Sequence, residues 1–412
     1  MTQSNRKIYW ITLAVIAFYT LDLVPYFHFS NIAVGKAFLL FFESLVFILL
    51  LNAKGMNKAK YRDINVAVLV YIILLALRLI VDFVFKGKEF FVYQNTITIF
   101  VFYTGLAIIP FFFFSRVRVS LNPRVLLMGL YAVFLGALVL SLQNIINGNA
   151  EASTSDRFSG EGGFSILYGH LGVSLFFISL CLRYIDLNKL LKIAMTIVGV
   201  IVGLLSMIFS GSRGPFIAFL VLSVLYFFIN AKNRKWRMVV FVSLVLIAVF
   251  FKPILGVVND FLESYDIVSF NRVYQTFMSQ GDGASGRDDY YLYAFNEFLD
   301  NPIFGKAYLM DNGAYVHNIF IEQLRAIGLI GGVLFLVFTL YAIRRGYKVF
   351  KLNKDVLIIY LLFIQYIVYG CFSSSIIAIP QYWIGLYVVL NYINQYGISF
   401  SNHTNIRLQR AS

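Results

Sequence analysis

Apolar runs of about twenty residues recur from one end of the chain to the other, and short polar segments separate them. A helix of this length spans the hydrocarbon core of a bilayer. The short alternating segments that are typical of membrane β-barrels do not occur. The pattern predicts an all-α, polytopic membrane helical bundle of about twelve transmembrane helices. These spans are expected near residues 8–27, 32–52, 64–85, 94–114, 125–145, 164–183, 190–210, 215–230, 238–252, 318–343, 355–373 and 376–395.

Composition strengthens this prediction. The 412 residues are 60% hydrophobic and only 13% charged, whereas a soluble domain is about half apolar and about a quarter charged. Both cysteines, Cys181 and Cys371, lie inside apolar runs and are expected as buried side chains rather than as a disulfide. We expect residues 1–412 to form a single membrane domain.

The formal net charge of +14 does not indicate a nucleic-acid partner, because the positive residues follow the expected topology. Alternate connections between the spans are basic, namely AKGMNKAKYR, SRVRVSLNPR, RYIDLNKLLK, AKNRKWR and RRGYKVFKLNK. Short basic loops stay on the cytoplasmic side of a membrane. Both termini are therefore expected in the cytoplasm, and the remaining connections on the outer side.

Two of the outer connections are long. Residues 146–163 are polar and rich in Gly and Ser, and residues 253–317 form a large external loop between the ninth and tenth spans. We expect this loop to fold as a cap of two short helices, and the second helix should end at Asn301-Pro302 and Gly305. Residues at helical spacing define their apolar faces, namely Val258, Phe261, Leu262 and Tyr265 in the first helix and Tyr291, Phe295 and Phe298 in the second. An interfacial anchor without a further role is the alternative.

The motif SGSRGP places Arg213 at the expected outer tip of a helical hairpin. Pro215 suits the first turn of the following helix, and Ser212 is a candidate N-cap. The free N–H groups of that helix then point outward beside Arg213, and Gly214 lets a bulky anion approach the backbone. A helix N-terminus, a guanidinium and glycine together predict a phosphate-binding site in a polar outer rim. Arg287 is a candidate second guanidinium; the alternative is that Asp288 and Asp289 neutralise it.

His317 lies where the tenth span begins, directly before Asn318. The positive end of the helix dipole disfavours the imidazolium, so we expect a neutral ring near pH 7. A neutral imidazole beside a bound phosphate is a candidate general base, a role worth about 10²–10⁴ in rate. The alternative is an interfacial histidine bonded to a carbonyl or to Asn318.

The order of these motifs resembles the O-antigen ligase and O-antigen polymerase superfamily of bacterial envelopes. It runs from Arg157 through SGSRGP and SGR…NPIFGKA to HNIFIEQLRAIGLIGG, and it ends near Leu334. Many members carry a tryptophan after the SGR, where this chain has DDYYLYAF. Tyr290 or Tyr291 offers a similar aromatic surface.

The resemblance implies metal-independent glycosyl transfer on the outer side of the bacterial cytoplasmic (inner) membrane, with no cofactor. Arg213, Arg287 and the more variable Arg157 match the diphosphate-binding arginines, and His317 matches the catalytic base. Supporting roles are expected for four residues, namely Ser212, Gly214, Asn318 and Glu322.

The implied donor is a glycan linked through diphosphate to undecaprenol, and the acceptor is a glycan or a lipid-linked hydroxyl. Membrane lipid and a chain-length regulator protein are further expected partners. A surface polysaccharide polymerase, for O-antigen or capsule, is favoured over an O-antigen ligase that transfers finished glycan to lipid A core or another terminal acceptor.

Proteins of other classes fit the sequence less well. A metal-dependent polyprenol-sugar glycosyltransferase needs acids in the first outer loop, where only Asp22 and then His28 occur. A lipid-glycan transporter or flippase is expected to show internal repeats and broken helices near the bilayer midplane, and the sequence shows no repeat. Cell-wall polymerases of the shape-and-division class share the polyprenol donor but fit the order of the motifs less well.

Two pairs of opposite charges inside the predicted spans are explained by pairing on a helix face, without a role in substrate binding. Arg78 and Asp82 are four residues apart, and Glu322 and Arg325 are three apart. At these spacings side chains meet on one face of a helix. We therefore expect each pair to form an ion pair within its own span.

Overall fold

The computed structural model describes residues 3–21, 32–51, 63–87, 96–146, 165–231, 251–264 and 287–409, with the single positions 235, 238, 274, 275 and 278. Within these ranges the chain is helical and has no β-strand, which confirms the all-α prediction. The predicted span 238–252 lies almost entirely outside the described residues.

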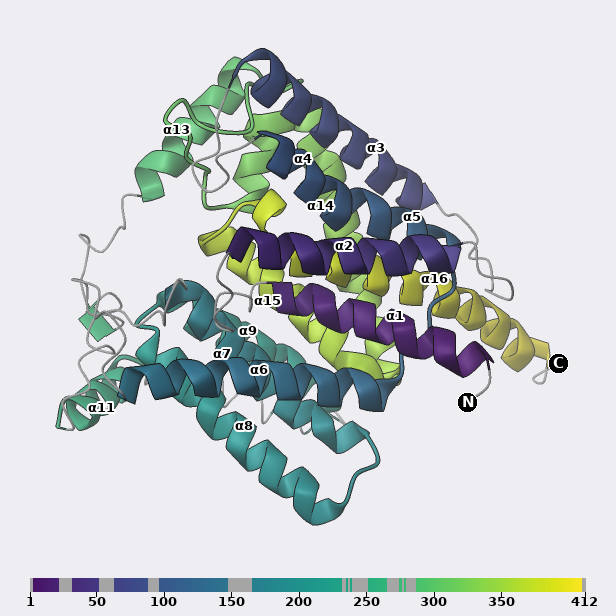
Figure 1. Cartoon of the computed structure of the whole chain (residues 1–412), viewed down its shortest axis with the longest axis vertical. Helices are drawn as coiled ribbons and strands as arrows, with labels where there is room; N and C mark the ends of the chain where they lie inside the picture. Colours follow the sequence, from purple (N-terminus) through teal and green to yellow (C-terminus); the bar gives the residue numbers. More distant parts are fainter. Residues whose placement is uncertain are drawn as a thin grey trace. The chain divides into compact units, whose positions relative to one another are not determined.

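The helices occupy the positions that the apolar runs predict (Figure 1). They are α1 (Gln3–Thr20), α2 (Ile32–Leu51), α3 (Asp63–Leu79) with a π-helix over Ile80–Phe85, α4 (Thr96–Tyr103) with a π-helix over Thr104–Ile108, α5 (Ile109–Arg116), α6 (Pro123–Ile146), α7 (Ser165–Cys181), α8 (Lys189–Phe209), α9 (Arg213–Asn230), α11 (Phe251–Glu263), α13 (Arg287–Asp300), α14 (Ile319–Leu352), α15 (Leu357–Phe372) and α16 (Pro380–Gln409). Of the described helical stretches, 8 are long and apolar enough to cross a membrane. The chain is thus a multi-pass membrane protein, while the number of about twelve spans stays a prediction.

The chain divides into two compact units. The first comprises residues 1–21, 36–126 and 286–412, and its long helix α14 packs against α3, α13, α15 and α16. Aromatic rings fill the core between these helices, namely Tyr71, Phe335, Phe338, Tyr382 and Trp383. The indole of Trp383 also donates a hydrogen bond to the carbonyl of Ile376, 3.0 Å away.

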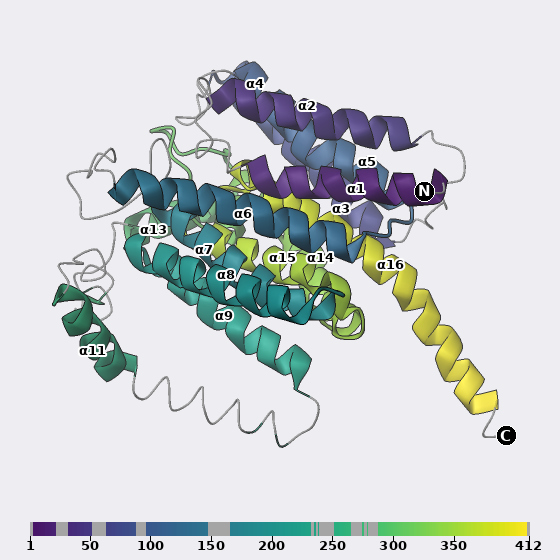
Figure 2. The same ribbon diagram turned by 60° about the horizontal axis from the view of Figure 1, so that its bottom comes forward.

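The second unit comprises residues 22–35 and 127–285. Helix α7 is its centre and packs against both α8 and α9, and the three helices lie side by side in both views (Figure 2). Tyr131 of α6 donates to the carbonyl of Met195 in α8. The expectation of a single membrane domain stays a prediction.

Helix α13 lies where the sequence predicts the second short helix and ends at Asp300, directly before Asn301-Pro302. Helix α11 overlaps only the start of the first predicted helix, and Phe261 of the predicted apolar face is 60% exposed, whereas Leu255 and Asn259 are buried. The inner face of α13 differs from the prediction. Ala294 and Glu297 are buried, whereas Phe295 is 45% exposed. The difference arises because Glu297 has ionic partners inside the fold, which a pattern of apolar residues does not reveal. The cysteines are free, with Cys181 buried and Cys371 partly buried, as predicted.

Candidate functional site

The SGSRGP motif forms the tight hairpin between α8 and α9 that the sequence predicts. Helix α8 ends at Phe209, Gly211 takes a left-handed backbone conformation with φ 56°, and α9 begins at Arg213. A left-handed residue directly after a helix is usually glycine, because a Cβ is disfavoured there. Arg213 is therefore the first residue of a helix whose free N–H groups lie at the tip.

Ser212 is the N-cap residue of α9, but its side chain does not cap the helix. Its hydroxyl donates instead to the carbonyl of Ser210 at 3.1 Å and thereby braces the turn. The N-terminal amides of α9 consequently receive no oxygen from Ser212. The position of the cap was predicted correctly, and its chemistry was not.

The hairpin tip is more buried than the predicted outer rim. Ser210 is 0% and Ser212 is 5% exposed, Gly214 is buried, and Arg213 is half-buried. Helix α7 contacts the tip: a Cβ added to Gly169 would lie 2.5 Å from both the Pro215 ring and the Ser210 hydroxyl. This close packing means that substitutions at the small residues of the tip affect folding as well as binding.

His317 lies two residues before α14 begins, directly before the N-cap position, as predicted. Asn318 is the N-cap of that helix, and its side chain accepts hydrogen bonds from the amides of Phe320 at 3.0 Å and Ile321 at 3.2 Å. His317 has φ 61°, and it is the one non-glycine residue with positive φ in the described part of the chain. This conformation costs of order 1–3 kcal/mol and persists only where the surroundings enforce it.

Two tyrosine rings lie near His317. The ring centroid of Tyr315 lies 4.2 Å from that of the imidazole, and the centroid of Tyr290 lies 6.2 Å away. Tyr290 is one helical turn after Arg287, the first residue of α13. The start of α13 and the start of α14 therefore meet at His317. Tyr290 lies where the family resemblance suggests an aromatic surface.

The loop between α13 and His317 docks into a break in α14. Gly328 has φ 63° and ψ −162°, which interrupts the helix. The amide of Lys306 donates to the carbonyl of Arg325 at 2.8 Å, and the amide of Leu329 donates to the carbonyl of Pro302 at 2.7 Å. The loop thus pairs with backbone groups beside the break. Gly305, with φ 70°, lies against the same turn of α14.

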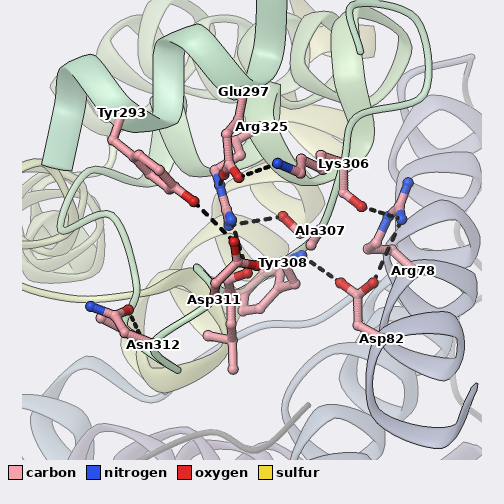
Figure 3. Close-up of polar contacts among 12 residues, drawn as sticks. Arg78, Asp82, Tyr293, Glu297, Lys306, Ala307, Tyr308, Asp311, Asn312 and Arg325 are labelled. Atoms are coloured by element: carbon pink, nitrogen blue, oxygen red, sulfur yellow. Dashed lines mark hydrogen bonds and ion pairs between the residues drawn. The ribbon is translucent and has the colours of Figure 1, made fainter. Parts of the chain in front are cut away.

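Arg325 is fully buried and holds the same loop (Figure 3). It forms an ion pair with Glu297 of α13 and donates to the carbonyls of Ala307 at 3.0 Å and Leu309 at 2.9 Å. Lys306 is a second partner of Glu297, with Nζ 2.7 Å from the carboxylate. The prediction that Arg325 forms an ion pair with Glu322 within its own span is therefore wrong.

The pKa of Glu297 is lowered, because burial raises it less than the hydrogen bonds from Lys306 and Arg325 lower it. The same carboxylate raises the pKa of Lys306. Both groups are thus held in their charged forms. A fully buried arginine needs such a partner, because an unpaired buried charge is strongly destabilising.

Arg78 forms the predicted pair with Asp82, with Nη1 3.6 Å from the carboxylate. It also donates to three loop carbonyls, at 2.7 Å to Phe304, 3.1 Å to Gly305 and 3.0 Å to Lys306. Asp82 lies in the π-helix that follows α3 and accepts a hydrogen bond from the amide of Tyr308. This pair therefore fixes the loop from the side of α3 (Figure 3).

Glu322 is fully buried on α14, and its partners show a structural role. One carboxylate oxygen accepts hydrogen bonds from the Tyr308 hydroxyl at 2.9 Å, the Gln323 amide at 3.0 Å and the backbone N–H of Ile376 at 3.1 Å. Ser375 also bonds the Tyr308 hydroxyl. Glu322 therefore links the loop after α13 to the connection between α15 and α16.

The structure brings some of the predicted site residues together. In the first unit Tyr290 in the first turn of α13 meets His317, Asn318 caps α14, and Glu322 bonds Tyr308 of the loop between the two helices, while the side chain of Arg287 lies outside the described residues. The second unit contributes the hairpin with Ser212, Arg213 and Gly214, while Arg157 lies outside the described residues. In the part of the chain that the structure describes, no group of three His, Cys, Asp or Glu side chains is placed to bind a metal ion.

Sequence reasoning missed Glu297, Lys306 and Tyr308. Each meets its partner through a contact between elements, so neither helical nor strand periodicity marks it. The signal that was present is the pair Gly305 and Gly328, whose positive φ values allow the loop and the helix backbones to touch.

The fold and the site together define a class of polytopic membrane protein that has an arginine-bearing hairpin and a histidine at a helix start. The O-antigen ligase family model matches residues 198–336, about a third of the chain, from within α8 to within α14. This match confirms the resemblance to the O-antigen ligase and polymerase superfamily, and it indicates a glycosyltransferase or ligase type of enzyme that acts in polysaccharide biosynthesis on lipid-linked glycans. No curated protein matches the chain.

Proposed function

We propose that the protein is a surface polysaccharide polymerase that transfers an undecaprenyl-diphosphate-linked glycan to an acceptor hydroxyl at the outer face of the cytoplasmic membrane. The observation that carries this proposal is the O-antigen ligase match over residues 198–336, which contains both the hairpin of Arg213 and the helix start at His317. A ligase that transfers finished glycan to lipid A core is the second candidate within the same family.

In the proposed reaction His317 takes the proton of the acceptor hydroxyl, and the hydroxyl oxygen forms a bond to C1 of the donor sugar. The C1–O bond to the lipid diphosphate breaks, and the leaving diphosphate keeps the electron pair. Arg213 and the N-terminal amides of α9 stabilise its growing charge, with Arg287 and Arg157 as further guanidinium donors. Guanidinium groups supply this stabilisation without a metal ion.

Two features of the site support these roles. Arg213 is the first residue of α9, so its charge adds to the positive end of the helix dipole. His317 is held in a strained conformation between Tyr290 and Tyr315, and strain of this kind clusters at functional sites. Aromatic rings beside a base also offer a surface on which an acceptor sugar can stack.

The test uses a strain from which the chromosomal copy has been deleted. The proposal predicts that this strain accumulates an undecaprenyl-diphosphate-linked glycan of one repeat unit and that the purified protein converts it to a ladder of longer lipid-linked products. A single transfer to a terminal acceptor, without a ladder, would identify a ligase. Absence of any transfer from this donor would refute the proposed function.

A further inference from the structure

The side chain of Arg325 joins the two ends of the segment that contains His317. Arg325 lies in the second turn of α14 and donates to the carbonyls of Ala307 and Leu309. Helix α14 itself begins two residues after His317. The two ends of the segment 307–325 are therefore in contact, and His317 lies just before the point where this segment becomes helical.

Hydrogen bonds and side-chain packing link the segment held by Arg325 to Val316, the residue before His317. The amide of Met310 donates to the carbonyl of Ala314 at 2.9 Å, and the amide of Gly313 donates back to Met310 at 3.0 Å. The side chain of Asn312 accepts from the amide of Ala314 at 3.0 Å and completes a tight turn. Val316 is fully buried and packs with Met310. We expect a displacement of Leu309 to move Val316 and, through the backbone, His317.

Burial and polar partners fix the orientation of Arg325. It is 0% exposed, and its ion pair with Glu297 ties it to α13, the helix whose first turn meets His317 (Figure 3). The planar guanidinium directs one edge to the carboxylate and separate N–H groups to the two carbonyls. A lysine has one ammonium group and cannot satisfy all three acceptors in this geometry.

We propose that Arg325, oriented by Glu297, is a positioning residue that determines the position of His317 and maintains its left-handed backbone conformation. The inference rests on the proposed function, in which His317 accepts the proton of the acceptor hydroxyl. A general base must lie within hydrogen-bond reach of that proton, and a displacement of about 1 Å reduces the rate by about 10²-fold. Arg325 acts through the 307–316 backbone and not on the donor.

The test measures kcat and KM for Arg325→Lys and Arg325→Ala, with the lipid-linked glycan that the deletion strain accumulates as donor. We expect Arg325→Ala to lower kcat about 10- to 100-fold and Arg325→Lys to restore part of it. Binding of undecaprenyl diphosphate, the bare donor lipid, should stay within about twofold of wild type. A purely structural loss would reduce the active fraction, and with it binding and turnover together.

Asn391→Ala is the matched control. Asn391 is also buried and donates to two backbone carbonyls, those of Phe114 and Val117, but it has no contact with the 307–316 segment among its described hydrogen bonds. We expect its turnover per folded molecule to equal that of wild type.

If both Arg325 variants fail to fold, Asn312→Ala tests the same path from an exposed position. It removes the side-chain bond to Ala314 and should lower kcat about 2- to 5-fold with unchanged donor binding. Unchanged kcat in a folded Arg325→Ala, or in Asn312→Ala when Arg325 variants do not fold, would overturn the inference. Inactive wild-type protein would instead overturn the proposed function.

Discussion

Gly328→Ala tests the docking of the 301–306 loop into α14. The backbone at Gly328, with φ 63° and ψ −162°, belongs to a region that only glycine adopts readily, so alanine there costs about 1–3 kcal/mol. The added Cβ would also lie 2.2 Å from the carbonyl oxygen of Ile303 and 2.6 Å from the amide nitrogen of Gly305. These contacts are far shorter than van der Waals distance, and both neighbours are backbone atoms.

The loop must therefore move away, and the backbone bonds Lys306 N–H to Arg325 and Leu329 N–H to Pro302 are broken or stretched. Each buried group left unsatisfied costs about 1–3 kcal/mol. We expect a destabilisation of at least about 3 kcal/mol, the lower end of these combined costs. At about 2.1 cal/mol/K per residue, this corresponds to a decrease in Tm of roughly 3–4 °C.

The assay is thermal unfolding of purified protein in detergent, with Gly136→Ala as control. Gly136 lies inside α6, and a Cβ there meets nothing within 4 Å. Alanine is the better helix former by about 1 kcal/mol, so Tm should stay equal or rise. Equal Tm values for Gly328→Ala and Gly136→Ala would refute the loop docking.

Three further predictions concern pH, topology and metal. The pKa of Glu297 is lowered in the folded state, so its ion pairs stabilise the fold fully above the unfolded pKa of about 4.3, and this stability is lost as pH falls through the folded value. The difference in Tm between wild type and Glu297→Gln should therefore shrink in acid. A constant difference from pH 7 to pH 3 would contradict this. Reporter fusions at Lys235 and Lys351 should be cytoplasmic. Fusions at Gly148 and Gly283 should be external, and a cytoplasmic Gly283 would place the site in the wrong compartment. Transfer should survive EDTA, whereas complete loss that a divalent metal restores would support the metal-dependent alternative.

Local patterns were sufficient to predict most of the helices and the two helix starts. Apolar runs of membrane-spanning length define their positions regardless of tertiary contacts, because every backbone group must be bonded within the span. The SGSRGP hairpin was likewise predictable, since glycine, an N-cap position and proline act within a few residues. The Arg78–Asp82 pair follows the same rule, with both partners on consecutive turns.

The partner of Arg325 could not be predicted in this way. Spacing along the helix favours Glu322, but the side chain reaches Glu297, 28 residues earlier, because the loop after α13 folds back against the break at Gly328. Glu322 is then free to bond Tyr308. The capping hydroxyl of Ser212 was misassigned for a similar reason, since the carbonyl of Ser210 in the tight turn competes for it. Neither of these two interactions produces a periodic pattern in the sequence.

The roles proposed for Arg213 and His317 are tested most directly by measuring, on purified and folded variants, both binding of undecaprenyl diphosphate and transfer from the accumulated lipid-linked glycan. His317→Asn is the appropriate variant, because asparagine tolerates the left-handed backbone at φ 61° better than alanine. The account predicts that His317→Asn binds the lipid normally but transfers at least about 10²-fold more slowly. Arg213→Ala should lose both binding and transfer, with Arg213→Lys in between. Full transfer by Arg213→Ala, or by His317→Asn, would contradict the account.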